Sequence, residues 1–279
     1  MAYRTILAIL DTPDNAEIAT DFACALAADH QAHVIGLHAE IVAAVPLVVP
    51  MEIPDPIAVQ ALQDMARTEA HDIEKLFRAR AAQRSVPFEW LNFASSVGYA
   101  SQPLLERARS ADLLLAVQPD PAKPSDAHVD VESFLFESGR PVLMVPYIFK
   151  TPKPIKRVLI AWNGSKEAAR ATFDAMPFLK AAESVEIFSV EPVESASHAP
   201  YAPGAEIAAT LLRHGVKATH RTAETADKTA QVIANRLSDS SIDLLVMGAY
   251  THSRLWQMMF GGTTKTLLQS MTALTLLAR

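Results

Sequence analysis

The chain alternates short apolar runs with longer segments in which apolar residues recur every three or four positions. The short runs are typical of buried parallel strands, and the longer segments are typical of amphipathic helices. In the first half this pattern predicts strands at Tyr3–Leu10, Ala32–His38, Pro87–Ala94, Asp112–Val117 and Pro141–Val145, a turn at Thr12–Asp14, and helices at Asn15–His30, Ile57–Gln83, Tyr99–Ser110 and Val131–Ser138.

The same pattern restarts after Tyr147–Ile155, a linker that carries two prolines. The second half predicts strands at Lys156–Trp162, Ser184–Val190, Lys217–Thr222, Asp243–Met247 and Ala273–Ala278, and helices at Ser165–Ala182, Ala205–His214 and Lys228–Ser238, with a last helical segment that opens at Thr263. Strands that alternate with helices imply parallel sheets joined by right-handed crossovers. The sequence therefore predicts an α/β fold of two tandem, doubly wound, Rossmann-like domains, residues 1–147 and 156–279, each with a five-stranded parallel sheet.

The amino-acid composition disfavours some classes of function. The formal net charge is −6 and no basic tract occurs, which disfavours a nucleic-acid partner. The single cysteine, Cys24, lies in an apolar helical pattern and predicts a buried thiol in a cytoplasmic protein. The apolar stretch Ile41–Ile53 is interrupted by Pro46 and Pro50, so we expect no membrane span.

The stretch Ile242–Thr266 is the strongest candidate for a binding site. An apolar run, Ile242–Met247, ends at Gly248, and a polar loop then leads to Gly261–Thr264, where a helix is predicted to open. A glycine-bearing loop between a strand and a helix can direct backbone N–H groups at a phosphate. In doubly wound sheets ligands bind at the carboxyl ends of the strands, here the first and fourth strands of each half.

This stretch resembles the nucleotide loop of the universal stress protein family, Gly-x2-Gly-x9-Gly-Ser/Thr. Gly248 and Gly261 coincide with the first and third glycines, whereas Thr251 replaces the second glycine and Gly262 the Ser/Thr, with Thr263 one residue later. The segment AWNGSKEAARA, which follows the first strand of the second half, adds to the resemblance. The resemblance covers essentially the whole chain, as a tandem UspA-like member with two adenine nucleotide alpha hydrolase-like domains. It implies that the last strands of the halves pair antiparallel in an intrachain pseudo-dimer, and it leaves a further homodimer open.

The resemblance also implies a stress-response protein that binds an adenine nucleotide such as ATP, with or without Mg²⁺. Asp11 matches the family's adenosine-contacting aspartate, but the loop Gln118–Asp130 has no glycine, so we expect the first half not to bind. The second half keeps the glycines and has Asn163 in place of the aspartate. The residues that the resemblance assigns to the nucleotide are Ala161, Trp162, Asn163, Met247, Gly248, Tyr250, Thr251, Gly261, Gly262, Thr263 and Thr264.

Thr251 is where the chain departs most clearly from the family pattern. A β-branched residue at positive φ is strained by about 1–3 kcal/mol. If the loop keeps the family's conformation, this strain predicts weak binding of ATP.

Several alternatives stay open. The loop Gly261–Thr264 also suits a plain turn in which Thr263 caps a helix, and the paired domains also suit a nucleotide-independent scaffold. An ATP hydrolase is least favoured, because no general base or nucleophile stands beside the loop. Asp11 and Asp14 could hold a metal, although a turn with an Asx cap is favoured, and no histidine pair has metal-ligand spacing. The segment Ile41–Pro56 suits either a lid or an ordered connection.

Overall fold

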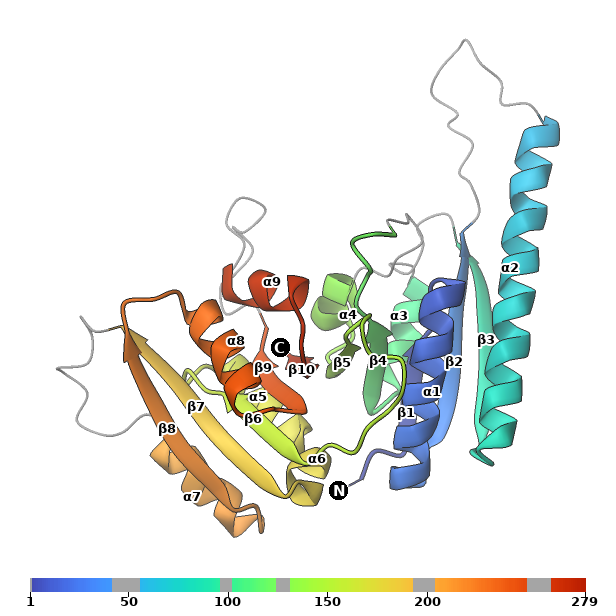
Figure 1. Ribbon diagram of the computed structural model, residues 1–279. Helices are drawn as coiled ribbons and strands as arrows, with labels where there is room; N and C mark the ends of the chain where they lie inside the picture. Colours follow the sequence, from blue (N-terminus) through green and yellow to red (C-terminus); the bar gives the residue numbers. More distant parts are fainter. Residues whose placement is uncertain (1, 42–55, 96–101, 124–130, 193–203, 250–261) are drawn as a thin grey trace. The chain divides into compact units, whose positions relative to one another are not determined.

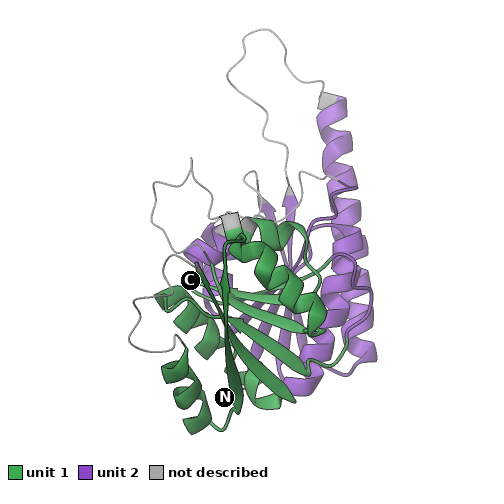
Figure 2. Cartoon of the chain, turned by 60° about the vertical axis from the view of Figure 1, so that its left-hand side comes forward, with its two compact units in different colours: residues 1–2, 139–146, 153–279 green, residues 3–138, 147–152 purple. Residues whose placement is uncertain are grey.

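The computed structural model describes residues 2–41, 56–95, 102–123, 131–192, 204–249 and 262–279. They form two compact units, coloured separately in Figure 2. Unit 2 contains residues 3–138 and 147–152, and unit 1 contains residues 1–2, 139–146 and 153–279. Each unit is an α/β body of mostly parallel strands and helices.

Unit 2 contains four parallel strands in the order β3-β2-β1-β4 (Figure 1). Right-handed crossovers place α1 and α2 on one face and α3 on the other. The strands are β1 (Thr5–Ile9), β2 (His33–Ile41), β3 (Phe88–Ser95) and β4 (Leu113–Val117), and the helices are α1 (Pro13–His30), α2 (Pro56–Gln83), α3 (Gln102–Arg109) and α4 (Val131–Glu137).

Unit 1 has the strand order β5-β10-β9-β6-β7-β8, in which only β5 runs antiparallel to its neighbour. The strands are β5 (Val142–Val145), β6 (Arg157–Ala161), β7 (Ser184–Pro192), β8 (Ala218–Thr225), β9 (Leu244–Gly248) and β10 (Leu274–Ala278), and the helices are α5 (Lys166–Asp174), α6 (Met176–Ala181), α7 (Ala205–Arg213), α8 (Thr229–Asp239) and α9 (Gly262–Gln269). The predicted pairing of the last strands of the two halves is confirmed, with Leu276 of β10 opposite Leu143 of β5. Because of this pairing β5 groups with unit 1, and the domain boundary at Tyr147–Ile155 stays a prediction.

The internal repeat is visible in a shared contact at the amino ends of the central strands. In unit 2, Asp112 Oδ2 accepts hydrogen bonds from the backbone N–H groups of Arg4, at 2.8 Å, and Thr5, at 3.0 Å. In unit 1, Asp243 Oδ2 accepts the same pair of bonds from Lys156, at 3.0 Å, and Arg157, at 2.8 Å. Each aspartate therefore holds the start of its half's fourth strand against the start of the first.

The core lies along the central strands of each unit. Every residue of β4 and β10 is buried, because helices cover both faces of these strands. Fully burying one leucine side chain contributes about 1.5–3 kcal/mol, so these leucine-rich runs are a main source of stability. This burial explains why the apolar runs located the strands correctly.

Two predicted helix boundaries were wrong. The single helix predicted at Ser165–Ala182 is two helices, α5 and α6, which are separated at Ala175. Pro177 lies in the first turn of α6, where its missing N–H group costs nothing, although it would break a continuous helix. Similarly, α1 begins at Pro13 rather than Asn15, because the Thr12 side chain caps it.

The segment Ile41–Pro56, for which a lid and an ordered connection were both open, falls almost wholly on residues 42–55, outside the described residues. The predicted loop Gln118–Asp130 is described only as far as Lys123. Within the described ranges, no helix combines the length and the hydrophobicity needed to cross a bilayer.

Burial makes Cys24 a testable marker of the folded state. Its side chain is fully buried in α1, and loss of hydration raises the pKa of the thiol to about 11. At pH 8 we therefore expect on the order of a hundredfold less thiolate than in the unfolded chain, since the ordinary pKa lies about two units lower. Alkylation by iodoacetamide should be slow in the native protein and fast in urea. Equal rates in both conditions would show that Cys24 is accessible.

Candidate functional site

The candidate site lies at the carboxyl ends of β6 and β9 in unit 1. These two strands are hydrogen-bonded neighbours, and Ala161 at the end of β6 is opposite Met247 on β9. Their side chains differ in exposure: Met247 is buried, Ala161 and Trp162 are half-buried, and Asn163 is exposed. The structure therefore brings together five of the predicted site residues: Ala161, Trp162, Asn163, Met247 and Gly248.

The turn from β6 to α5 orients Asn163. Its side-chain oxygen accepts a hydrogen bond from the backbone N–H of Ser165 at 3.1 Å, which is an Asx turn, and Gly164 between them adopts a φ of 72°. Ser165 then caps α5, because its hydroxyl accepts from the N–H of Ala168 at 3.1 Å. The exposed Asn163 side chain thus has its oxygen engaged and can offer its amide N–H groups to a ligand.

Gly248 ends β9 and needs to be glycine for reasons of space. A Cβ atom added there would lie 2.5 Å from the backbone nitrogen of Ala168 and 2.6 Å from the carbonyl carbon of Glu167. Those atoms belong to the first turn of α5 and cannot move aside as a flexible side chain could. The end of β9 therefore packs directly on the backbone of α5, beside the Asn163 turn.

The N-terminus of α9 is the third part of the site. A right-handed crossover from β9 to β10 puts this helix start at the carboxyl end of the sheet. Thr263 is half-buried, Thr264 is buried, and the first turn carries no acidic residue. The dipole of an acid-free helix start favours an anion. The predicted residues Tyr250, Thr251 and Gly261 lie outside the described residues, and Gly262 is the first residue of α9.

The equivalent aspartate in unit 2 is engaged by its own neighbours. Asp11 is only 2% exposed, and its Oδ1 accepts from the backbone N–H of Thr12 at 2.8 Å and from the side-chain amide of Asn15 at 3.0 Å. Thr12, rather than an Asx residue, caps the helix that follows, so the Asx cap that the sequence favoured at Asp11 and Asp14 is replaced by a threonine cap. Within the described ranges, no group of three or more His, Cys, Asp or Glu residues could hold a metal.

His38 is a further difference between the two halves. It follows the β2 residue that pairs with Ile9, is buried, and its Nδ1 lies 2.6 Å from the carbonyl oxygen of Leu10 at the end of β1. The matching position on β7 is Ser189, which is 2% exposed and whose hydroxyl has no hydrogen-bond partner. A bulky imidazole therefore lies beside β1 at the position where β7 places a small hydroxyl beside β6.

The loop after β4 adds a second difference. Lys123 Nζ lies 2.5 Å from Asp14 Oδ2, so the loop reaches the first turn of α1, and this contact lowers the pKa of Asp14 below its ordinary value. Sequence reasoning missed His38 and Lys123, because neither belongs to a local motif.

Comparison with solved structures identifies the fold. A universal stress protein from Archaeoglobus fulgidus superposes with a TM-score of 0.71 at 13% identity, covering 99% of this chain and 96% of that chain. A functionally unknown protein from Pseudomonas aeruginosa PAO1 (TM-score 0.58, 16% identity, 99% and 92% coverage) and a putative universal stress protein from P. aeruginosa UCBPP-PA14 (TM-score 0.58, 17% identity, 99% and 93% coverage) are also similar. No family model and no curated protein matches the sequence. The chain has the two-domain fold of universal stress protein structures.

The packing at Gly248 predicts a contrast between two glycines of the site. We expect Gly248→Asn to lower the free energy of unfolding by about 1–3 kcal/mol, because the new side chain overlaps the backbone of α5. Gly164→Asn is the matched control, since Gly164 has open space around it and asparagine tolerates a positive φ. Urea unfolding of both variants measures the difference. Equal losses would show that space at Gly248 is not limiting.

Proposed function

We propose that this chain is a member of the universal stress protein family and that it binds an adenine nucleotide, ATP, weakly and in unit 1 only. The observation that carries the proposal is the acid-free N-terminus of α9 beside the paired ends of β6 and β9. The fold likeness supports family membership but specifies no ligand. A cytoplasmic location, which the sequence predicted, belongs to the same proposal.

The proposed pose follows from which groups remain available. Asn163 presents amide N–H groups that can bind a ribose hydroxyl while its oxygen holds the Asx turn. The backbone around Ala161, Trp162, Met247 and Tyr250 would line the base. The phosphates would bind at Gly248, Thr251 and Gly261–Thr264, with the dipole of α9 directed at them. The proposal assigns no protein ligand to Mg²⁺, which would bind through the phosphates.

We propose binding without efficient hydrolysis. None of the residues assigned to the nucleotide is a carboxylate, a histidine or a cysteine, so none can activate a water molecule as a general base. An ATP analogue and ATP should therefore bind alike. The nucleotide would act as a signal or as a stabilising ligand of the fold.

The close packing at Gly248 favours a second candidate function, a nucleotide-independent scaffold. Close packing of β9 on α5 explains Gly248 without any ligand. In unit 2, Asp11 and His38 are likewise held by hydrogen bonds within the chain, which is consistent with a fold that needs no ligand there. The scaffold reading therefore predicts that unit 1 binds nothing either.

A charge placed at the start of α9 tests the proposal. Thr263→Glu should keep the helix, because an acid in the first turn is favourable to the dipole, but it should repel a phosphate. We expect calorimetric titration to show ATP affinity lowered roughly tenfold or more, which is a loss of at least about 1.4 kcal/mol of binding free energy. The affinity for adenosine should be unchanged.

Thr229→Glu, in the first turn of α8, is the matched control and should leave both affinities at the wild-type value. If Thr263→Glu leaves ATP affinity unchanged, the phosphates do not bind at α9. If the wild type binds neither ligand, the scaffold reading holds.

A further inference from the structure

The two sheet edges that end in β3 and β8 carry different side chains. Strand β8, the edge of unit 1, exposes Thr219, Arg221, Thr222 and Glu224. Strand β3, the edge of unit 2, carries half-buried Trp90, Leu91 and Phe93. Charged side chains deter pairing at an edge, whereas a long apolar edge strand favours it. Within the described ranges, no strand pairs with the outer side of β3.

The β2–β3 register shows which backbone groups face outward. The carbonyl of Pro87 accepts from the N–H of Val34 at 2.9 Å, and Val34 is the register partner of Phe88. Residues of a strand alternate between bonding to a neighbour and pointing away from it. The backbone N–H and C=O groups of Phe88, Trp90, Asn92 and Ala94 are therefore directed to the outer edge.

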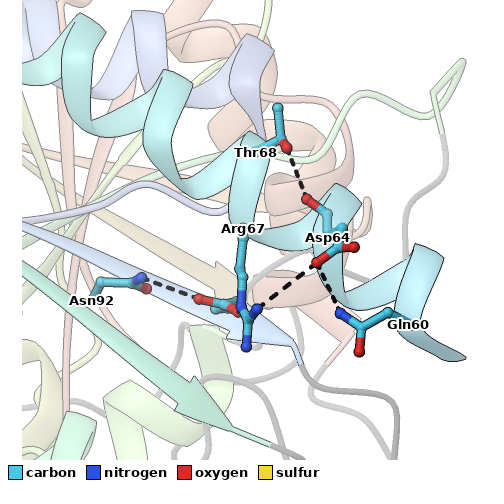
Figure 3. Close-up of polar contacts among 6 residues, drawn as sticks. Gln60, Asp64, Arg67, Thr68 and Asn92 are labelled. Atoms are coloured by element: carbon cyan, nitrogen blue, oxygen red, sulfur yellow. Dashed lines mark hydrogen bonds and ion pairs between the residues drawn. The ribbon is translucent and has the colours of Figure 1, made fainter.

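Side-chain contacts confirm the two faces of β3. Phe88 and Trp90 contact Phe77 of α2, with ring centroids 5.7 Å apart in both pairs. Asn92 lies on the same face, next to the polar cluster of Figure 3, and its amide donates to Glu40 at 3.3 Å. On the opposite face Arg107 of α3 pairs with Glu89 at 2.9 Å. The charge of Glu89 is thus neutralised within the unit.

We propose that the outer edge of β3 pairs antiparallel with β3 of a second copy of this chain. A two-fold axis perpendicular to the sheet keeps like faces together, so opposed residues share a face. With the axis at Asn92, Leu91 is opposite Phe93 and Trp90 is opposite Ala94, each pair occurring twice. Asn92 is opposite its own equivalent, so apolar residues meet apolar residues and polar meets polar.

Other registers match less well. An axis at Leu91 sets Glu89 opposite Phe93 and Trp90 opposite Asn92. An axis at Trp90 sets Glu89 opposite Leu91 and Phe88 opposite Asn92. Cross-strand pairs contribute about 0.2–1 kcal/mol each, so a register with only compatible pairs is favoured.

The helices on the junction are compatible with this pairing. Neighbouring strands lie about 4.8 Å apart, and α2 packs over both β2 and β3. In the paired dimer the two copies of α2 would therefore lie side by side, near the usual spacing of about 8–10 Å between helix axes. The flank of α2 toward β3 carries Asp64, Arg67, Glu74 and Arg78, which are two acids and two bases. The junction therefore adds no net charge to a chain of net charge −6.

A pair of lysine variants tests which edge associates. By sedimentation equilibrium the wild type should have twice the chain mass of 30.3 kDa, and Asn92→Lys should have the mass of one chain, because two like charges then face each other. Thr222→Lys, an exposed position in the middle of β8, should remain a dimer. A monomeric wild type overturns the proposal. That is the result expected if β3 pairs only with extended peptides. A dimeric Asn92→Lys also overturns the proposal.

Disulfide formation tests the register. Leu91 and Phe93 of opposite copies form a non-hydrogen-bonded pair with Cα atoms about 4.5 Å apart, within disulfide reach. Like residues of the two copies are offset diagonally by about 7–8 Å, which is too far. An oxidised mixture of Leu91→Cys and Phe93→Cys should therefore give a linked dimer that neither variant gives alone, and the buried Cys24 should stay unreacted. No excess of linked dimer in the mixture overturns the register.

Discussion

The pairing of β9 between β6 and β10 is the interaction on which the organisation of unit 1 depends. Its ladders to both neighbours fix where three strands end, and the Asp243 carboxylate fixes where β6 and β9 begin. At the other end Gly248 allows β9 to approach the backbone of α5. The candidate site is therefore a consequence of strand register and close packing. Its geometry would exist with or without a ligand.

The two halves share this framework and differ in a few side chains at the strand ends. Unit 2 repeats the aspartate anchor at Asp112, but its Asp11 is engaged locally and His38 contacts the end of β1. Unit 1 has Asn163 and Ser189 at the matching positions. A duplicated fold can thus differ in the side chains at its strand ends without moving a strand. The buried hydroxyl of Ser189, which lacks a partner, is the clearest mark of this difference.

Much of the fold followed from the sequence, because burial on both faces leaves a direct signature. The apolar runs located the strands, and the restart of the pattern at Lys156 indicated the repeat. Boundaries failed where one local feature decided them, as at Pro177 between α5 and α6. The role of His38 could not be predicted, since its partner, the carbonyl of Leu10, is 28 residues away and is set by strand register. The sequence identified Gly248 as a ligand-loop glycine, whereas its surroundings give a packing reason.

We propose that a nucleotide binds at the ends of β6 and β9 and the start of α9, and that unit 2 does not bind one. The most direct test is a ¹H–¹⁵N correlation spectrum of the assigned protein, recorded during titration with ATP. We expect amide shifts at Trp162–Ser165 and Thr263–Thr264, with Thr12–Asn15 unchanged. Shifts confined to Thr12–Asn15, or no shifts in either set at saturating ATP, would contradict it.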